Sequence, residues 1–345
     1  MASPPSPGRT KRTRKRHGGL TLTDVARLAG VSPITVSRAL NTPAQLTAET
    51  LARVRDAVSR TGYVPNRVAG GLASSKSRLV AALVPTIASQ VFLETIQSLT
   101  ETLAASGYQV MLGQSGYGEA REDALIDAII GRRPDGVILT GVMHSADGRR
   151  RLAAAGIPVV ETWDLTPTPI DMVVGFSHEK AGAAVAEYLH FRGSRRPAIA
   201  SANDYRAGLR RRGFENTAAR HGWSEIPVEL VPTPTSLGAG RRALVSLLDA
   251  HPGIDAVFCS SDVMALGVLT EAQARGIRVP QELRVFGFGD NNFAADCHPP
   301  LSTVRIDGNA IGRQAARFVI DRAEGREIPQ RIIDLGFKLV GRASA

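Results

Sequence analysis

The chain has 345 residues, of which 43% are hydrophobic, so it is long enough to form two or three domains with a sizeable core. Its two cysteines, Cys259 and Cys297, exclude a disulfide framework and do not stand in a metal-binding spacing. The sequence contains no apolar run of about 18 residues, and its basic N-terminus lacks the apolar stretch of a secretory signal, so we expect a cytoplasmic protein without a membrane partner.

The net charge of +10 is concentrated at one end of the chain. Residues 1–78 contain 14 Lys and Arg against 3 Asp and Glu, whereas the remaining 267 residues contain 28 against 29. A basic head on a neutral body indicates that one end binds a polyanion. A solvated basic arm over residues 1–19 explains only part of the excess, because the other arginines of the head lie in patterned sequence.

Residues 20–66 are predicted to form three helices. The first begins near Thr23, which we expect to cap it, and ends at Gly30. The second runs from Pro33 to Leu40 or Asn41 after the capping residue Ser32, and the third covers residues 48–61. Two short helices joined by a turn that contains glycine predict a helix-turn-helix, whose second helix enters the major groove of DNA.

The second helix has one apolar face and one face available to DNA. Val36 and Leu40 stand four residues apart and are predicted to point inward. On the other face, Arg38 can bind a guanine bidentately, Ile34 can contact a thymine methyl, and Ser37 can reach a base edge or a phosphate. An ordinary helical hairpin in a core is the alternative, but the exposed face and the charge both favour DNA.

Residues 67–74 follow the third helix and contain Gly70 and Gly71. Each glycine costs about 1 kcal/mol in a helix, so this segment is a poor helix on its own. A segment that orders only on DNA, with Leu72 as an apolar wedge in the minor groove, fits the sequence. A flexible linker is the alternative, and composition alone favours it.

The motif TLTDVARLAGVSPITVSRALN at residues 21–41, followed by GYVPNR at residues 62–67, resembles the DNA-binding head of the LacI/GalR family of bacterial repressors. The resemblance implies a homodimer on a palindromic operator and a hinge helix within residues 67–77, in which Leu72 opens the central base step. The residues expected at the DNA are Thr23, Ser32, Pro33, Ile34, Thr35, Ser37, Arg38, Asn41, Asn66, Arg67, Ala69 and Leu72.

From residue 78 onward, apolar runs typical of buried parallel strands alternate with helical stretches. The predicted strands cover residues 79–85, 108–112, 135–140, 157–160, 197–201, 228–231, 256–259 and 284–288. Two successive sets of βα units predict an α/β fold with two doubly wound lobes and a cleft at their strand ends. The body resembles the periplasmic-binding-protein-like sensor of the same family, which implies an effector-binding domain at residues 78–345. Its lobes would be about 78–175 with 307–333, and 176–306 with 334–345.

Enzyme motifs are missing from the sequence. The glycine-rich residues 113–118 lack the GxGxxG spacing, and no phosphate-binding loop, GxSxG or HExxH motif occurs. The seven histidines, including His144, show no metal-ligand spacing. We therefore expect no catalytic activity, no cofactor and no bound metal.

Strand ends and family positions together nominate the residues of the cleft. They are Ser89, Phe92, His144, Glu161, Trp163, Phe176, Arg206, Arg210, Ser261, Asp262 and Asp290. The family often has Asn at the position of Ser261 and Asp at that of Gly289, groups that hold neutral sugar hydroxyls. Without that carboxylate, Arg206 and Arg210 favour an anionic ligand, although both can instead be solvated helix charges.

Several short phrases are similar to the gluconate-utilisation repressors of the LacI/GalR family. They lie at residues 107–112, 135–140, 157–161, 174–176 and 334–337. This resemblance implies gluconate, a sugar acid, as the inducer that releases a repressor from its operator. The alternatives are another ligand of the same fold (2-ketogluconate, 6-phosphogluconate, a neutral sugar or a purine), an activator, or a sugar-acid receptor without a DNA role.

Overall fold

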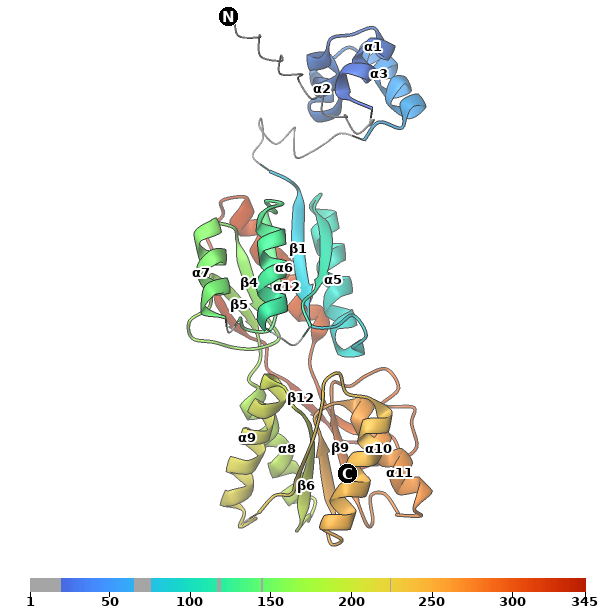
Figure 1. Ribbon diagram of the computed structural model, residues 1–345, viewed down its shortest axis with the longest axis vertical. Coiled ribbons are helices and arrows are strands. Elements are labelled where there is room, and N and C mark those ends of the chain that lie inside the picture. The colour runs from blue at the N-terminus through green and yellow to red at the C-terminus, as the bar shows by residue number, and fades with distance from the viewer. Residues whose placement is uncertain (1–19, 65–75, 117–118, 144, 224) are drawn as a thin grey trace, which may run out of the picture. The chain divides into compact units, whose positions relative to one another are not determined.

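The computed structural model describes residues 20–64, 76–116, 119–143, 145–223 and 225–345 (Figure 1). The chain divides into two compact units, residues 1–75 and residues 76–345. The predicted basic arm, residues 1–19, and the predicted hinge up to residue 75 lie outside the described ranges. Within those ranges, no helix is both long and apolar enough to cross a membrane.

The head consists of three short helices around a small core, as predicted. Its elements are α1 (Leu22–Ala29), α2 (Pro33–Asn41), the 3-10 turn η1 (Pro43–Gln45) and α3 (Ala48–Thr61). Val25, Val36 and Val54 are fully buried between them. Gly30 ends α1 with a φ of 63°, and the hydroxyl of Ser32 accepts a hydrogen bond from the N–H of Thr35 at the start of α2. These features confirm the helix-turn-helix.

The prediction that Thr23 caps α1 is wrong, because the cap is Thr21. The Asp24 carboxylate accepts a hydrogen bond from the Thr21 N–H at 2.9 Å, and the Thr21 hydroxyl accepts one from the Asp24 N–H at 3.4 Å. This reciprocal capping box needs an acidic residue three positions after the cap, and Asp24 stands at that distance from Thr21. Thr23 is instead an exposed residue of the first helical turn.

The body contains two six-stranded sheets, each covered by helices on both faces. The first has the order β11-β5-β4-β3-β1-β2 and is parallel throughout, with Val80 of β1 paired to Val110 of β2 and to Gly136 of β3. Its strands are β1 (Leu79–Val84), β2 (Gln109–Gln114), β3 (Gly136–Thr140), β4 (Val159–Thr162), β5 (Met172–Gly175) and β11 (Ile332–Asp334).

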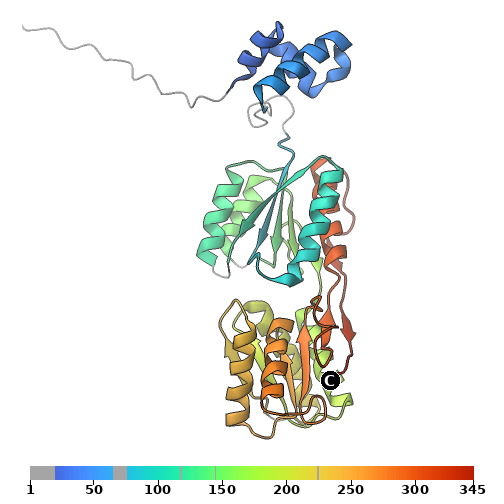
Figure 2. The same cartoon turned by 90° about the vertical axis from the view of Figure 1, so that its right-hand side faces the viewer.

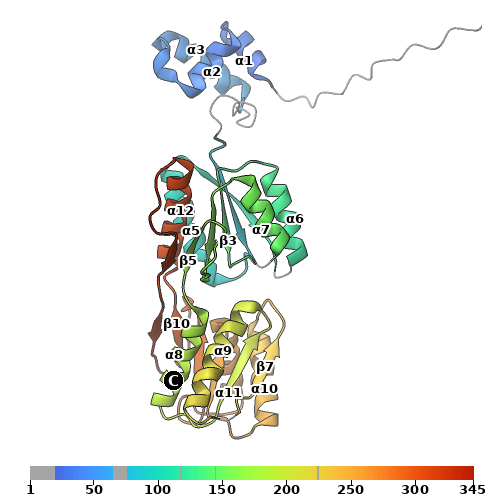
Figure 3. The same ribbon diagram turned by 90° about the vertical axis from the view of Figure 1, so that its left-hand side faces the viewer.

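Two pairs of helices cover the first sheet. In Figure 3, α6 (Glu119–Ile130) and α7 (Ala146–Ala155) lie on one face, and α5 (Leu93–Ala105) and α12 (Gly308–Ala323) lie on the other. The 3-10 turn η2 (Gln90–Phe92) leads into α5.

The second sheet has the order β12-β10-β9-β8-β6-β7, in which only the pair of β12 with β10 is antiparallel. Its strands are β6 (Pro197–Ala202), β7 (Val228–Val231), β8 (Ala256–Cys259), β9 (Arg284–Phe288), β10 (Ser302–Arg305) and β12 (Lys338–Val340). One face carries α8 (His178–Phe191) and α9 (Tyr205–Arg220), and the other carries α10 (Leu237–Ala250) and α11 (Asp262–Ala274) (Figure 1).

The chain passes between the two lobes three times, after β5, after β10 and after β11. Figure 2 shows the late, red-coloured part of the chain running from one lobe to the other. Parallel strands place their carboxyl ends at one edge of each sheet, and these edges are where open α/β sheets bind ligands. The predicted α/β architecture with a two-lobed body is confirmed.

Candidate nucleic-acid interface and ligand cavity

One face of α2 is open to solvent and carries an arginine. Pro33 and Arg38 are exposed, and 65% of the surface of Ile34 is accessible. Arg38 has no ion-pair partner within the described part of the chain. An unpaired guanidinium beside an exposed apolar side chain on a helix of this motif is suited to reading base edges.

The other predicted DNA residues fall into two groups. Thr35 and Ser37 are half-buried, and exposed Asn41 donates a hydrogen bond from its side-chain amide to the Ser37 carbonyl at 3.0 Å. Ser32 caps α2 and is exposed, as is Thr23 on α1. Asn66, Arg67, Ala69 and Leu72 lie outside the described residues.

The body holds a cavity of about 320 Å³ at the carboxyl ends of strands from both sheets. Segments after β1, β4, β6, β7, β8 and β9 contribute to its wall, together with the start of α8 and the first turns of α9. Six of the predicted residues line it: Ser89, Phe92, Trp163, Arg206, Arg210 and Ser261. The topology therefore brings together residues that are up to 172 positions apart in the sequence.

Aromatic rings form much of the cavity wall. Phe92 and Trp163 meet edge to face with ring centroids 5.1 Å apart, and the Trp163 indole N–H donates to the Thr95 hydroxyl at 3.1 Å. Trp163 has a φ of 63°, a left-handed backbone conformation that is costly for a non-glycine residue and typical of binding sites. Phe176 does not line the cavity but lies buried behind it, against Trp163 and Phe288.

The two predicted arginines line this cavity, and each has a side-chain N–H group without a hydrogen-bond partner among the described residues. Arg210 is 6% exposed; its Nη2 donates to the Ser260 carbonyl at 3.1 Å, and its guanidinium carbon lies 4.0 Å from the Phe288 ring centroid. The guanidinium carbon of Arg206 lies 5.4 Å from the centroid of Phe92. Arg210 Nε and Arg206 Nη1 are both buried, and neither has a hydrogen-bond partner among the described residues. Buried donors of this kind are suited to an anionic ligand.

Burial also shifts the pKa of the ionisable groups around these arginines. Desolvation raises the pKa of Asp164 to about 6, although Arg206 and Arg210 act in the opposite direction. Desolvation lowers the pKa of Arg210 to about 10, although the negative charge of Asp204 acts to raise it. Asp204 caps α9 and also lines the cavity. The pKa of His178 lies well below its usual value because the ring is buried and faces both guanidinium groups.

The predicted ligand role of Glu161 is not supported, because its carboxylate is fully engaged elsewhere. Glu161 is buried, accepts hydrogen bonds from the N–H groups of Met143 at 3.0 Å and Ile170 at 2.9 Å, and pairs with Arg149 at 3.2 Å. It therefore joins two loops of the first lobe and does not line the cavity. His144, which follows Met143, lies outside the described residues.

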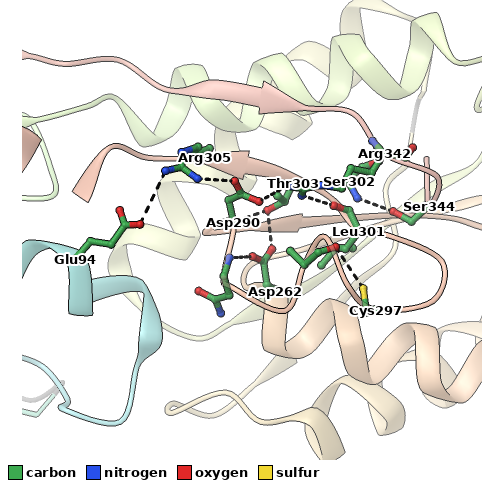
Figure 4. A network of polar contacts seen from close by, with 12 residues as sticks. Glu94, Asp262, Asp290, Cys297, Leu301, Ser302, Thr303, Arg305, Arg342 and Ser344 are labelled. Atoms are coloured by element: carbon green, nitrogen blue, oxygen red, sulfur yellow. Dashed lines mark hydrogen bonds and ion pairs between the residues drawn. The ribbon is translucent and has the colours of Figure 1, made fainter. Parts of the chain in front are cut away.

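Asp262 and Asp290 are likewise satisfied within the second lobe and do not line this cavity (Figure 4). Asp262 accepts hydrogen bonds from the Thr303 hydroxyl at 2.6 Å and the Asn291 N–H at 2.7 Å. Asp290 pairs with Arg305 at 3.1 Å and with Arg342 at 2.7 Å. A buried carboxylate must be paired or hydrogen-bonded, and these neighbours meet that need without a ligand.

Sequence reasoning missed several polar residues of the cavity wall. They are Thr86, His178, Asp204, Thr235 and Ser260. Most of these residues follow strand ends, so the strand pattern could have indicated them. His178 begins a helix, and no sequence pattern indicated that it lines the cavity. Among the described residues, no group of three or more His, Cys, Asp and Glu side chains is placed to hold a metal ion.

The fold and the two sites define a class of bacterial transcription regulator, with a helix-turn-helix head and a ligand-binding body. Residues 21–66 match the family of bacterial regulatory proteins, lacI family, and residues 186–345 match the periplasmic binding protein-like domain. The HTH-type transcriptional regulator GntR of Pseudomonas aeruginosa is 40% identical over 330 residues, which cover 95% of this chain and 96% of that protein. The chain therefore belongs to the LacI family and is a DNA-binding transcription regulator.

Other relatives and solved structures agree with this assignment. The regulator GntR of Escherichia coli is 30% identical over 92% of this chain and 96% of its own length. A LacI-family transcriptional regulator from Silicibacter pomeroyi has a TM-score of 0.88 at 33% identity, covering 94% of this chain and 99% of its own. The transcription regulator GntR from Chromobacterium violaceum has a TM-score of 0.75 at 38% identity, covering 77% and 98%. All of these relatives are transcription regulators.

Proposed function

We propose that this protein is a dimeric repressor that a sugar acid, gluconate or a close relative, releases from a palindromic operator. The observation that carries the ligand class is that Arg206 and Arg210 both line one cavity, and each keeps a buried donor, Nη1 and Nε respectively, that has no hydrogen-bond partner among the described residues. Leaving such donors unpaired is costly, and a carboxylate supplies acceptors for both. The relatives named GntR support the same ligand class.

The rest of the cavity suits the polyol portion of such a ligand. Thr235, Ser261 and Asn291 offer hydroxyl and amide groups, and Thr235 and Ser261 already lie within hydrogen-bond distance of each other at 3.0 Å. Phe92 and Phe288 supply apolar surface for the C–H groups of a sugar chain. In this proposal the effector-binding domain is the body, residues 78–345.

At the other end of the chain, α2 would read the operator. The exposed Ile34 and Arg38 would contact base edges in the major groove, and two heads on a symmetric dimer would read two half-sites. The predicted hinge, residues 67–77, would fit between these half-sites, with Leu72 in the minor groove.

A neutral sugar is the second candidate ligand. The aromatic wall favours it, and the regulator CelR, solved as a cellobiose complex, has a TM-score of 0.69 at 28% identity to this chain. Titration calorimetry with gluconate, 2-ketogluconate, 6-phosphogluconate, glucose and cellobiose separates the two classes. We expect gluconate or a related acid to bind and glucose not to bind.

Two matched variants on α9 test the assigned donors. Arg206→Gln should weaken gluconate binding about tenfold or more, because a charge-assisted hydrogen bond contributes about 1.5–3 kcal/mol. Arg212→Gln is the control, since Arg212 is exposed on the same helix and pairs with Glu179 at 3.4 Å. Equal gluconate affinity in the wild type and Arg206→Gln, or tighter binding of glucose than of gluconate, would refute the sugar-acid assignment.

A further inference from the structure

His178 lies between an arginine of the cavity and the backbone of the other lobe. It is the first residue of α8 and is 3% exposed. Its Nδ1 lies 2.9 Å from Arg210 Nη1 on α9, and its Nε2 lies 2.8 Å from the carbonyl oxygen of Trp163, which follows β4 of the first sheet. The imidazole therefore lies within hydrogen-bond distance of one residue from each lobe.

The two partners determine the protonation state of the ring. A guanidinium group has only hydrogen-bond donors, so Nδ1 must accept from Arg210. A carbonyl oxygen only accepts, so Nε2 must carry the proton and donate to Trp163. Each ring nitrogen thus has one partner of the right kind only in the neutral, Nε2-protonated tautomer. A doubly protonated ring would place an N–H group against the N–H of Arg210.

We propose that His178 is a positioning residue for effector binding, which holds the Arg210 guanidinium in its orientation at the cavity wall and joins it to Trp163. This inference rests on the proposed function in one respect, namely that an anion binds to Arg210. Three contacts would define the orientation of the guanidinium: His178 on Nη1, the Ser260 carbonyl on Nη2, and the Phe288 ring 4.0 Å below its central carbon.

The packing of α8 on α9 places His178 beside Arg210. A Cβ on Gly182 would lie 1.8 Å from the Arg210 carbonyl oxygen, and a Cβ on Gly213 would lie 1.9 Å from the Glu179 carbonyl oxygen. Only glycine permits this backbone approach, so the two helices meet directly at the residues next to the contact. The position of His178 relative to Arg210 is consequently fixed by backbone packing, which is what a positioning role requires.

A double-mutant cycle on gluconate affinity tests whether His178 acts through Arg210. His178→Phe keeps an aromatic ring of similar size but removes both hydrogen bonds, whereas His178→Asn keeps an acceptor close to the position of Nδ1. We expect a loss of about 10-fold or more in gluconate affinity for His178→Phe, partial recovery in His178→Asn, and no further loss when His178→Phe is added to Arg210→Ala. Losses that multiply in the double variant would show an independent structural role and overturn the proposal.

Two controls accompany the cycle. His221→Phe makes the same substitution on a half-buried histidine outside the cavity, and it should leave gluconate affinity unchanged. Thermal unfolding of every variant checks the fold. If His178→Phe fails to fold, His178→Asn completes the same cycle, measured once with Arg210 intact and once together with Arg210→Ala.

A measurement without any ligand separates this inference from the proposed function. In ¹⁵N NMR spectra of the wild-type protein at neutral pH, we expect His178 to be the neutral Nε2-protonated tautomer, with a scalar coupling across the hydrogen bond from Arg210 to Nδ1. Arg210→Ala should abolish that coupling. If gluconate does not bind but these signals are present, the sugar-acid proposal fails and the placement of Arg210 by His178 stands. An Nδ1-protonated or charged ring overturns the inference.

Discussion

Asp164 is a buried carboxyl group beside the two cavity arginines, and its charge depends on pH in the physiological range. It is 4% exposed, and burial raises its pKa to about 6. Above pH 6 the carboxylate is charged and offsets part of the positive charge that an anionic ligand would meet. Below pH 6 it is neutral, so Arg206 and Arg210 act on the ligand with less competition.

Gluconate affinity should therefore rise a few-fold when the pH falls from 7.5 to 5.5. A sugar carboxyl with a pKa of about 3.5, like that of an α-carboxyl group, stays ionised over this range. The measurement is calorimetry at both pH values, and Asp164→Asn is the control, since it should bind tightly and without this pH dependence. A gluconate affinity that is unchanged or weaker at pH 5.5 than at pH 7.5, or a wild-type pH profile in Asp164→Asn, would show that Asp164 does not modulate the site.

Individual cavity residues were predictable from the sequence where the end of a strand alone determines where the residue lies. Ser89, Phe92 and Ser261 follow strand ends and line the cavity. Asp262 and Asp290 also follow strand ends, and Glu161 follows the predicted strand but lies within β4, yet each of these carboxylates is hydrogen-bonded or ion-paired within its own lobe. Those donors come from residues far away in the sequence, or from backbone N–H groups, so a strand pattern does not reveal them.

Most secondary-structure elements were predictable where the sequence carries local signals. All three head helices and most helices of the body show apolar periodicity, glycine ends or capping residues. The prediction omitted the strands β5, β10 and β11, each of three or four residues, because so short an apolar run shows no period, and it also omitted the 16-residue helix α12. The prediction also placed the cap of α1 at Thr23, two residues too late. The cap is Thr21 because its side chain and backbone form hydrogen bonds with Asp24.

The capping box predicts a difference between those threonines. Thr21→Ala should lower the stability of the head by about 1 kcal/mol, because it removes the cap hydrogen bond and leaves the Asp24 carboxylate without its partner hydroxyl. Thr23→Ala should change it by no more than about 0.5 kcal/mol, as is usual for exposed sites. Amide hydrogen exchange of α1 in the full-length protein measures both. A larger effect at Thr23 would place the cap there.

Helix α9 offers a matched pair of glycines for testing the packing against α8. Gly213→Ala should destabilise the body by about 1–3 kcal/mol, because its methyl group would overlap the Glu179 carbonyl. A methyl group on Gly208 would meet nothing within 4 Å outside the backbone of its own helix, so Gly208→Ala should be neutral or stabilising by up to about 1 kcal/mol. Chemical denaturation measures the stability of the two variants. Equal stabilities of Gly213→Ala and Gly208→Ala would show that α8 and α9 can move apart without loss of stability.

DNA recognition by α2 gives a prediction for the head. Arg38→Ala should weaken specific operator binding by about 1–3 kcal/mol, because it would remove the proposed bidentate contact to a base, and it should affect nonspecific binding much less. Binding assays with operator and random duplexes at one salt concentration make the comparison, with footprinting to show the protected palindrome. An equal loss of affinity for both duplexes would show that Arg38 contacts a phosphate and not a base.

Across the whole molecule, induction by gluconate requires that ligand binding in the cavity of the body changes operator binding by the helix-turn-helix of the head. A ligand shifts an equilibrium only by its different affinity for the two states, so gluconate must bind the free protein more tightly than the protein on its operator. Linkage then requires operator DNA to weaken gluconate binding by the same factor by which gluconate weakens operator binding.

Titration calorimetry of gluconate into the free protein and into its operator complex tests this requirement most directly. For a coupling of about 1–3 kcal/mol, the dissociation constant for gluconate should be roughly 5–150-fold higher in the operator complex, and glucose should show no binding to either. Arg206→Gln should remain bound to the operator when gluconate is added at concentrations that release the wild type. Equal gluconate affinity in the free and DNA-bound protein would contradict the proposed mechanism of induction.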